Sequence, residues 1–526
     1  MLKKFILFIF SISIITGFSQ VKHGLMQLRN VTSLGHTDTM DVAPIVFNPG
    51  DSTIIITGNQ KINGQQYNGL VASQADLAAN SWVNSFSNGS NKMFVTAAKT
   101  DSQGNIYTCG TIRTGTGLDY FLCKTDETGT IQFIVPLDGP NSTNDVALAL
   151  CLDEDNSRLF VTGGSDGTLL SLQDYCTECY DMSTGASLWA SPARYNFSNS
   201  FDVATHIAYD KATDHVIVSG FSGVTFTDYD IATVTYKASD GSQYDVQRES
   251  NSIGAGEDRV FGMATDTLGN VYIGGSTFQN NHFIGVVHKR DTALNAIWTK
   301  TIDLHGFDNH VMSLVLDDSL NVLVAGLSHL NTNEHHAFVF KYTNNGNPVW
   351  SAPLIKNPGT SEEALILKLK SGDEIFVGGH VKESNGNQDI LFTRLNRQGQ
   401  PNMGQRYSSS GNAVDRLMDF TLNQNETRLY ASVRSYNGVD YDNKALEYHY
   451  REVEMKPKTD TVINEKYADK EVLVEFHKST LRMNAINNRD KLYGTLGEFV
   501  QDSTCAKIED LLDPVNELRL KAKDLK

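Results

Sequence analysis

The chain has 526 residues, of which 40% are hydrophobic, 9% aromatic and 20% charged, and its length exceeds that at which one compact core usually divides into domains. This composition is typical of a globular protein and excludes both a polytopic membrane protein and a largely disordered chain. Asp and Glu number 61 against 44 Lys and Arg, for a net charge of -17, which excludes nucleic acid and anionic lipid as main partners because both require a basic surface.

The first 19 residues have the pattern of a signal peptide. Lys3 and Lys4 precede an apolar run over residues 5–15, and Gly17 and Ser19 are small residues at the spacing of a cleavage site. We expect cleavage after Ser19 and a protein that is secreted, periplasmic or at the cell surface. A membrane anchor is the alternative, but the apolar stretch is shorter than the ~20 residues of a bilayer span. We therefore expect no transmembrane anchor.

A unit of about 50 residues repeats eight times over residues 20–452. Its clearest copy joins residues 258–266 to residues 269–275 and to Trp298. All four Trp of the protein fall 23 to 26 residues after a glycine that ends the second apolar run of a copy. This glycine recurs at intervals of 51 to 57 residues, at Gly58, Gly110, Gly163, Gly220, Gly275, Gly326 and Gly379, with Val433 in the eighth place.

Each copy contains three β-rich runs separated by turn signals such as the Asp-Ser-Gln-Gly-Asn of residues 101–105, and the Trp marks a fourth run. We therefore predict a mainly β fold, an eight-bladed β-propeller of four-stranded antiparallel blades. An open solenoid is the competing arrangement, but it needs polar caps at both ends. The eighth copy lacks a fourth run, whereas a strand-like run at residues 25–31 precedes the first copy. We expect this N-terminal run to complete the last blade and close the ring.

The repeat resembles the SBBP-type β-propeller repeat of exported bacterial proteins over residues 25–452. The resemblance rests on an Asp that opens the first strand, on Gly-Asn-Val-Tyr-Ile-Gly-Gly at residues 269–275, on an apolar strand ending in Lys, and on the following Trp. The third, fourth and eighth copies lack the Gly-Asn turn. The resemblance implies a fold and an exported repeat protein, and it implies no particular activity because propellers carry many.

The composition changes after residue 450. Residues 451–526 hold 14 Lys and Arg and 15 Asp and Glu, more than twice the charge density of the preceding chain. We predict a linker at residues 453–464 and a small α+β domain at residues 465–526. The Glu-Val-Leu-Val-Glu-Phe of residues 471–476 resembles the first strand of the inhibitory prodomains of subtilisin-like peptidases, which implies a peptidase precursor or a peptidase-binding domain. A docking or spacer domain is the alternative, and we favour it.

Acidic or amide residues open the first strand of most copies, and a ring of them lining a funnel could hold a cation or a cationic ligand. The alternative, which we favour, is that a feature repeated in every blade satisfies backbone N–H groups between blades. Met93 takes this place in the second copy. The candidate ligand-binding residues are Asp41, Asp145, Asp202, Asp258, Asn309, Glu362 and Asp415.

Two of the six Cys are candidates for a disulfide. A symmetric hairpin centred on Thr116 would place Cys109 opposite Cys123 on one face of a sheet, and export would permit a bond between them; buried free thiols are the alternative. Cys176 and Cys179 form an isolated Cys-x-x-Cys pair without the second pair that a zinc site needs. We expect no metal site and no cofactor.

Three other motifs are interpreted as structural. Residues 163–167 fit Gly-x-Ser-x-Gly, but no helix follows Ser165 as a nucleophile elbow requires. Residues 153–157 lack the central Gly and terminal Glu of a calcium loop. Five histidines gather in one copy without Cys or carboxylates at ligand spacing, so we interpret them as loop residues: His305, His310, His329, His335 and His336.

Function is less constrained than fold. Our leading hypothesis is an exported, monomeric, non-enzymatic propeller that binds a protein or glycan partner on one of its faces, with no catalytic residue. One alternative is a polysaccharide-active enzyme that uses the propeller funnel, which would require a cluster of unlike polar residues that breaks the repeat on one face. Another is the N-terminal part of a subtilisin-like peptidase precursor, a propeller plus prodomain without the catalytic domain. Residues after 455 contain no catalytic Asp, His and Ser set, so this chain alone could not hydrolyse peptides.

Overall fold

The computed structural model describes residues 22–37, 44–49, 52–63, 66–75, 79–86, 93–114, 117–137, 144–167, 172–225, 228–249, 256–331, 334–353, 360–370, 374–383, 386–409, 414–423, 427–436 and 441–454. The predicted signal peptide, the linker, the C-terminal α+β domain, Asp41 and Cys505 lie outside these residues. Within them, no helix has the length and apolar character needed to cross a membrane.

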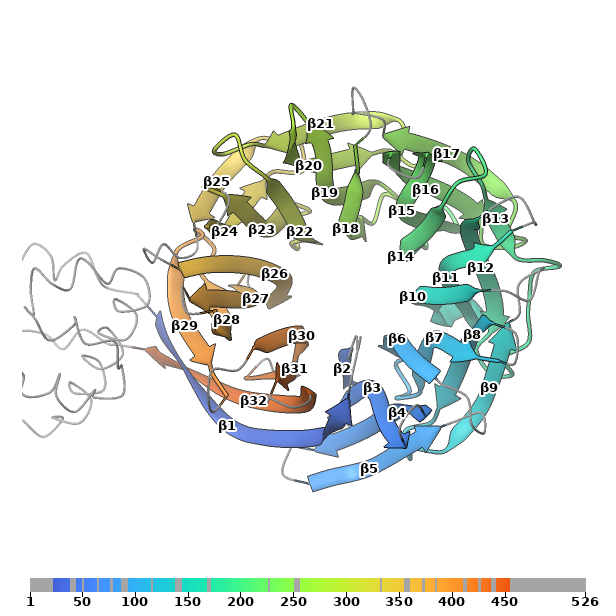
Figure 1. Ribbon diagram of the computed structural model, residues 1–526, viewed down its shortest axis with the longest axis horizontal. Helices are drawn as coiled ribbons and strands as arrows, with labels where there is room; N and C mark the ends of the chain where they lie inside the picture. The colour runs from blue at the N-terminus through green and yellow to red at the C-terminus, as the bar shows by residue number, and fades with distance from the viewer. Residues whose placement is uncertain are drawn as a thin grey trace, which may run out of the picture.

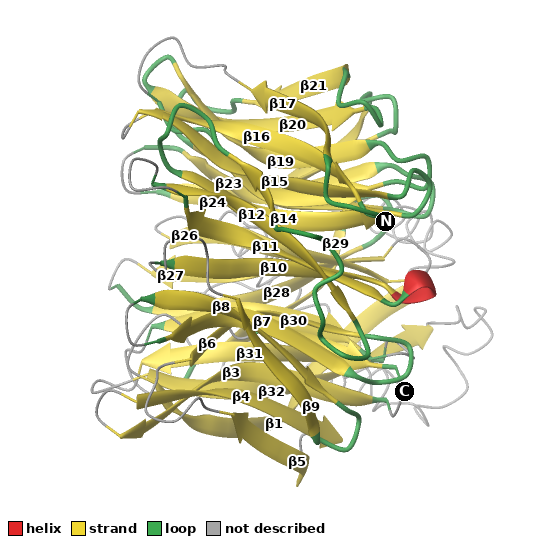
Figure 2. Cartoon of the chain, turned by 90° about the vertical axis from the view of Figure 1, so that its right-hand side faces the viewer, coloured by secondary structure: helices red, strands yellow, loops and turns green. Residues whose placement is uncertain are grey.

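The described residues form eight four-stranded antiparallel sheets arranged around an axis, as predicted (Figure 1). In each sheet the first strand of the blade lies innermost, and Figure 2 shows the same sheets stacked around the ring from the side. In the order in which the strands pair within each blade, blades one to four are β2 (Ile45–Asn48), β3 (Thr53–Asn63), β4 (Gln66–Ala75) and β5 (Ala79–Phe86); β6 (Met93–Thr100), β7 (Ile106–Arg113), β8 (Leu118–Thr125) and β9 (Ile131–Leu137); β10 (Asp145–Asp153), β11 (Arg158–Asp166), β12 (Gln173–Asp181) and β13 (Ala193–Tyr195); β14 (Asp202–Asp210), β15 (His215–Thr225), β16 (Asp228–Lys237) and β17 (Gln243–Glu249).

In blade three a 3-10 turn, η1 (Glu154–Asn156), joins β10 to β11. Blades five to eight follow the same plan as blades one to four. Their strands are β18 (Arg259–Thr265), β19 (Val271–Gln279), β20 (His282–Arg290) and β21 (Ala296–Ile302); β22 (Asn309–Leu316), β23 (Val322–His329), β24 (His335–Tyr342) and β25 (Pro348–Pro353); β26 (Thr360–Lys370), β27 (Glu374–Glu383), β28 (Gln388–Leu395) and β29 (Pro401–Tyr407); β30 (Asp415–Leu422), β31 (Arg428–Tyr436), β32 (Tyr441–Glu454) and β1 (Lys22–Thr37).

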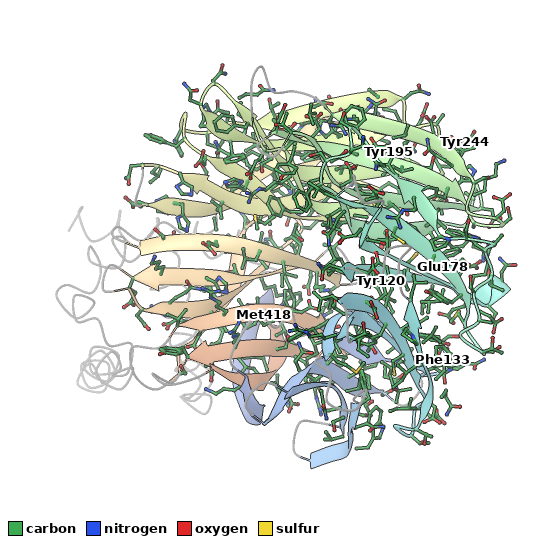
Figure 3. All side chains as sticks on the ribbon, turned by 45° about the vertical axis from the view of Figure 1, so that its right-hand side comes forward. Tyr120, Phe133, Glu178, Tyr195, Tyr244 and Met418 are labelled. Atoms are coloured by element: carbon green, nitrogen blue, oxygen red, sulfur yellow. The ribbon has the colours of Figure 1, made fainter. Side chains whose placement is uncertain are left out.

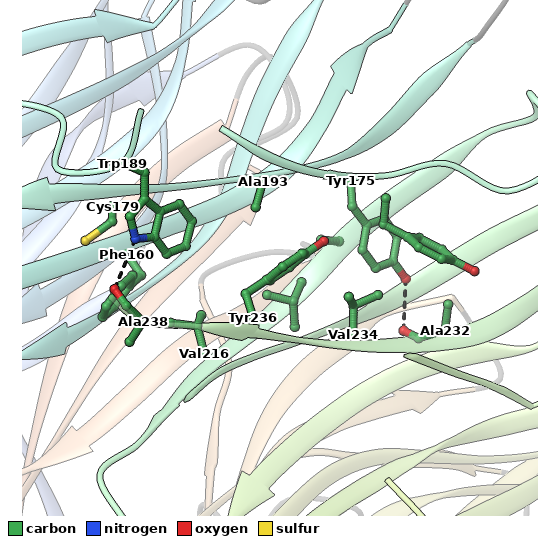
Figure 4. Packing of buried hydrophobic residues seen from close by; sticks show 13 residues of the cluster. Phe160, Tyr175, Cys179, Trp189, Ala193, Val216, Ala232, Val234, Tyr236 and Ala238 are labelled. Atoms are coloured by element: carbon green, nitrogen blue, oxygen red, sulfur yellow. Dashed lines mark hydrogen bonds between the residues drawn. The ribbon is translucent and has the colours of Figure 1, made fainter. Parts of the chain in front are cut away.

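The hydrophobic core lies between neighbouring blades. The second and third strands are buried on both faces, so they read as continuous apolar runs in the sequence, whereas the outer strands alternate. Figure 4 shows one such layer, in which Phe160 and Tyr175 of blade three pack against Val216, Val234 and Tyr236 of blade four. Figure 3 shows side chains projecting from the sheets of the blades.

A β-bulge in the first strand explains the repeated glycine. In blade two the pairing of β6 with β7 skips Thr96, and Val95 lies opposite Gly110. In six blades a Cβ on this glycine would lie 1.7–2.0 Å from a carbonyl oxygen of the first strand, that of the residue after the opening acidic or amide residue (after Met93 in blade two). These glycines are Gly110, Gly163, Gly220, Gly275, Gly326 and Gly379. The bulge therefore excludes a side chain at this position.

The four Trp side chains join each of their blades to the next. Trp189 of blade three donates a hydrogen bond from Nε1 to the carbonyl oxygen of Ala238 in blade four, at 3.0 Å (Figure 4). Its ring lies over Gly241, which has a φ of +75°, so a side chain there would meet both the ring and an unfavourable backbone conformation. Trp82, Trp298 and Trp350 donate in the same way to the carbonyl oxygens of Glu127, Asn344 and Arg397.

The ring closes as predicted. β1 pairs antiparallel with β32 from Lys22 opposite Glu454 to Thr37 opposite Tyr441, so the N-terminal strand is the outer strand of the blade formed by β30, β31 and β32. A propeller closed in this way leaves neither terminal blade with an incomplete sheet.

The predicted pairing of Cys109 with Cys123 is wrong in register. Cys109 lies opposite Leu122 and Cys123 lies opposite Thr108, because the hairpin is displaced by one residue from the symmetric arrangement. Successive residues of a strand face opposite sides of a sheet, so the two thiols belong to different core layers. Both are buried free cysteines.

Candidate functional site

The residues that open the first strands are buried, not exposed in a funnel. Asp145, Asp202, Asp258, Asn309, Glu362 and Asp415 are each at most 2% exposed. Asp41 lies outside the described residues.

Several of these side chains bind backbone N–H groups. Asp202 Oδ2 accepts a hydrogen bond from the N–H of Phe197 at 2.8 Å, Asp415 Oδ2 accepts one from the N–H of Ser409 at 2.8 Å, and Asp258 Oδ1 accepts one from the N–H of Phe278 at 3.0 Å. These contacts fit the structural alternative that the sequence left open. Burial raises the pKa of Asp202 to about 6, although the Phe197 N–H, the Ser222 hydroxyl and Arg248 lower it.

Glu362 of blade seven makes a different contact. Its Oε2 lies 2.6 Å from Nδ1 of His336, which belongs to β24 of blade six. Nε2 of the same imidazole lies 3.5 Å from Glu334. His336 therefore lies between two carboxylates from different blades.

Glu363, the next residue, lies between two other imidazoles. Its Oε1 is 3.2 Å from Nε2 of His335 in blade six, and its Oε2 is 3.2 Å from Nδ1 of His380 in blade seven. His380 Nε2 accepts a hydrogen bond from the N–H of Leu417 in blade eight, so His380 is held in one orientation. Burial raises the pKa of Glu363, but His335 and His380 outweigh burial and hold the pKa well below its ordinary value.

His310 and His329 extend this group toward blade five. The rings of His329 and His335 have centroids 5.0 Å apart, and His310 lies 5.0 Å from the ring centroid of Phe283. His310 Nδ1 is 3.1 Å from Oγ of Ser276 in blade five. Burial lowers the pKa of His310 to about 4, with further lowering by His329, Arg259 and His335 and an opposing effect of Asp308, so this imidazole is neutral at neutral pH.

An exposed apolar loop borders these residues. His282 Nε2 lies 3.3 Å from Asp303, which begins the loop between blades five and six. On this loop Leu304 is 42% and Phe307 is 40% exposed. The Asp308 carboxylate accepts a hydrogen bond from the N–H of Phe283 at 2.8 Å and holds the end of the loop against blade five.

We refer to these residues together as the histidine cluster. In an antiparallel blade the first strand begins, the second strand ends and the third strand begins at the same end of the sheet, so all the members gather at one end of the ring, which we call the entry face. The cluster comprises His282, His310, His329, His335, His336, His380, Glu362 and Glu363.

The interpretation of His310, His329, His335 and His336 as loop residues is wrong, because they lie in β22, β23 and β24. Their carboxylate partners were missed because these come from a different blade. His335 and Glu363 are 28 positions apart, which matches no ligand spacing. A signal was nevertheless present at the position directly after the opening acidic or amide residue of each copy. Blades five to eight carry Arg259, His310, Glu363 and Arg416 there, whereas blades three and four carry Val146 and Val203. Comparing equivalent positions between copies would have shown that one side of the ring is polar.

The other sequence motifs have structural roles. Ser165 lies within β11 and its Oγ accepts a hydrogen bond from Arg194 at 3.0 Å, so it is not at a nucleophile elbow. Asp153 accepts a hydrogen bond from Arg158 Nε at 2.7 Å beside η1. Among the described residues, no group of three or more His, Cys, Asp or Glu side chains is arranged to hold a metal ion.

No protein-family model matches the sequence, and no curated protein matches it. Solved structures similar to this chain include polysaccharide lyase Uly1, at 11% identity and a TM-score of 0.40, covering 67% of this chain and 89% of the lyase. The WD40 domain of SCAP from fission yeast has 9% identity and a TM-score of 0.42, covering 80% and 98%. An endo-arabinase from Bacteroides thetaiotaomicron has 13% identity and a TM-score of 0.26, covering 48% and 93%. Because the sequence identities are this low, the activities of these proteins are not assigned to this chain.

Proposed function

We propose that this protein is an exported, non-enzymatic β-propeller that binds a partner at the histidine cluster, and that the partner is a glycan. Export is supported by the pattern of the first 19 residues and by the resemblance of the repeat to that of exported SBBP-type proteins. Binding on one end of a ring is the usual arrangement for functional loops on a rigid scaffold.

The observation that carries the proposal is the break in the repeat at blades five to seven. At the position of His336, blades three, four and seven carry Asp174, Asp230 and Asp389, and each of these aspartates is paired with an arginine of its own blade. In blade six, by contrast, the imidazoles of His335 and His336 are paired with Glu363 and Glu362 of the neighbouring blade. Polar groups that converge from several elements on one surface are the usual mark of a binding site.

The chemistry of the cluster suits sugar hydroxyl groups. The Glu363 carboxylate, whose side chain is 30% exposed, accepts hydrogen bonds, the neutral imidazole of His310 both donates and accepts, and the partly exposed ring of Phe307 offers an apolar face beside them. A protein partner would use the same exposed Leu304 and Phe307 but would require a larger apolar area than these two side chains supply.

A screen of the purified full chain on an array of plant, algal and bacterial polysaccharides tests this function. We expect retention on at least one polysaccharide and loss of retention in a His329→Ala, Glu363→Ala double variant. The variant His215→Ala is the control, because His215 begins a second strand and therefore lies at the opposite end of the ring. Binding to proteins but not to any polysaccharide would contradict the glycan assignment, and equal losses in the control would contradict the assigned face.

A second candidate, a polysaccharide-active enzyme, is favoured by one observation. His310 is a neutral imidazole, and Arg259, at the equivalent position of blade five, lies near enough to lower its pKa further. β-Elimination from a uronate requires a neutral base and a cationic group, such as a guanidinium, that binds the carboxylate of the uronate. The base removes the proton on carbon 5 of the uronate, and the glycosidic bond on carbon 4 breaks. Incubation with polyuronates, followed by ultraviolet absorbance of the unsaturated product, distinguishes the enzyme from the binding protein.

A further inference from the structure

A pair of rings ends the sheet of each of three consecutive blades at the entry face. In blade five Phe278 lies opposite Phe283, and their ring centroids are 5.2 Å apart. In blade six His329 lies opposite His335 at the same position of the repeat, and their ring centroids are 5.0 Å apart. Each pair joins the end of a second strand to the start of a third strand, so both pairs belong to the entry face.

Blade four ends in a third pair. Gly223 takes the equivalent position of its second strand, and Tyr229 lies opposite this glycine. The ring of Tyr229 packs edge to face on that of Phe221, two residues earlier in β15, with centroids 5.5 Å apart. We refer to the members of the three pairs as the ring strip. All of them are partly exposed: Phe221, Tyr229, Phe278, Phe283, His329 and His335.

Blades three and seven carry polar residues at this position and bound the strip on its two sides. The cross-strand pairs outside the strip are Lys61 and Tyr67 in blade one, Arg113 and Leu118 in blade two, Asp166 and Gln173 in blade three, Lys382 and Gln388 in blade seven, and Tyr436 and Tyr441 in blade eight. Blade seven separates the tyrosines of blade eight from the strip. The strip is therefore a local departure from the repeat, in the same part of the ring as the histidine cluster.

Contacts between blades join the three pairs. The N–H of Asp258, which opens blade five, donates a hydrogen bond to the carbonyl oxygen of Tyr229 at 2.6 Å. The carboxylate of the same Asp258 accepts one from the N–H of Phe278 at 3.0 Å. The ring of Phe283 has its centroid 5.0 Å from that of His310 in blade six. The pairs thus follow one another along the entry face and end in the histidine cluster.

Charged side chains beside the strip pair with each other. Arg259 donates a hydrogen bond from Nε to Glu257 Oε2 at 3.0 Å, and His282 Nε2 lies 3.3 Å from Asp303. The whole chain has a net charge of -17, which repels a polyanion. These charges favour a neutral partner over an acidic one.

We propose that the glycan at the histidine cluster is a neutral chain that extends over the ring strip from blade six to blade four. This extended site rests on the proposed function and defines the length and charge of its glycan. The C–H groups on one face of a sugar pack against an aromatic ring, while its hydroxyl groups bind polar side chains. Sheets that pack face to face lie about 10 Å apart, so three blades span about 20 Å, which exceeds the length of a disaccharide.

The shape of the strip distinguishes a glycan chain from a protein. The strip is one ring pair wide, and polar groups such as Asp258 and His310 lie between successive pairs. A chain of linked sugars alternates apolar faces with hydroxyl groups in the same way, whereas a protein interface has a broad apolar centre.

Isothermal titration of the full chain with cello-, xylo-, manno- and laminari-oligosaccharides, from disaccharide to hexasaccharide, tests the proposal. We expect the affinity for at least one series to rise at least tenfold with length, because only the longer chains reach blade four. Tyr229→Ala and Phe221→Ala should each lower the affinity for the hexasaccharide of that series at least fivefold. Both should leave the affinity for its disaccharide within twofold, because the disaccharide binds at the histidine cluster. Tyr229→Phe keeps the ring and should bind the hexasaccharide within twofold.

Tyr244→Ala is the matched control. Tyr244 belongs to the same blade, is 50% exposed, and has its ring centroid 4.2 Å from that of His215, at the opposite end of the blade. We expect this variant to bind the hexasaccharide as the unmodified chain does. All variants are compared by thermal melting before titration, and Tyr229→Leu replaces Tyr229→Ala if the latter melts early.

The proposal is overturned if no hexasaccharide binds, if the hexasaccharide binds no more tightly than the disaccharide, or if both blade-four variants bind as the unmodified chain does. It is equally overturned if Tyr244→Ala loses as much affinity as they do, or if only acidic polysaccharides are retained in the array screen. The proposed function survives these results as long as retention depends on His329 and Glu363. Retention of no polysaccharide at all would contradict both.

Discussion

The repeat glycine is fixed by a single close approach within each blade. In blade six a Cβ on Gly326 would lie 1.8 Å from the carbonyl oxygen of His310, a member of the histidine cluster. The bulge that brings this carbonyl forward also turns the start of the first strand, where His310 is located. A residue with no side chain thus helps to position a residue of the candidate site.

Gly326→Ala should lower the free energy of unfolding by about 3 kcal/mol, because either the bulge or the paired strand must move to admit the methyl group. The control Gly306→Ala lies in open space at a φ of +69° and should cost only about 1 kcal/mol, from the backbone conformation alone. Chemical denaturation of the two variants measures both values. Equal costs would show that the carbonyl contact does not restrict this position.

Asp202 makes stability depend on pH. Its pKa is raised in the folded protein to about 6 from an ordinary value of 3.8, so the folded state binds the proton more tightly than the unfolded state does. Stability from this group is therefore greatest below the ordinary value and declines as pH rises through about 6.

In Asp202→Asn this decline should be absent. The difference in unfolding free energy between pH 4 and pH 7 should change by about 1–3 kcal/mol relative to the unmodified chain, as measured by denaturation at both values. Asn309 already fills the equivalent position in blade six, which indicates that the amide is compatible with the fold. An identical pH dependence in the two proteins would contradict the assigned pKa.

At the scale of elements, the Trp side chains connect one sheet to the next. Trp189 is 4% exposed and its bond to Ala238 is buried, whereas the bond from Trp82 to Glu127 is exposed. A carbonyl that loses its partner in a buried position cannot bind water instead.

Trp189→Phe should therefore destabilise the protein by about 2 kcal/mol and Trp82→Phe by about 1 kcal/mol or less. Thermal melting of the two variants provides the comparison. A larger effect at Trp82 would contradict the role assigned to the buried bond.

Much of the fold followed from the sequence because the repeat shows the same pattern eight times. The glycine spacing, the Trp positions and the missing fourth run of the last copy together indicated the blades and the closing strand. The hairpin register of Cys109 and Cys123 did not follow, because a one-residue displacement leaves the apolar pattern of two fully buried strands unchanged.

The histidine cluster also escaped prediction from the sequence. The imidazoles of blade six acquire their carboxylates from β26 of blade seven, and that contact depends on how adjacent sheets pack. The carboxylates that the sequence did single out, such as Asp202 and Asp415, are buried against backbone N–H groups.

At the scale of the whole molecule, one strand closes the ring. Deleting residues 22–37 would expose the edge of β32 along its length and leave the last blade with three strands. We expect a lower melting temperature and association of the shortened protein, observed by thermal melting and gel filtration. A monomer with an unchanged melting temperature would show that β1 does not contribute to closure.

The central claim is that the entry face at blades five to seven binds the partner of this protein. The most direct measurement is isothermal titration of a polysaccharide retained in the array screen against the full chain, His310→Ala and His215→Ala. We expect at least a tenfold loss of affinity for His310→Ala and an unchanged affinity for His215→Ala. Unchanged affinity in His310→Ala, or an equal loss in both variants, would contradict it.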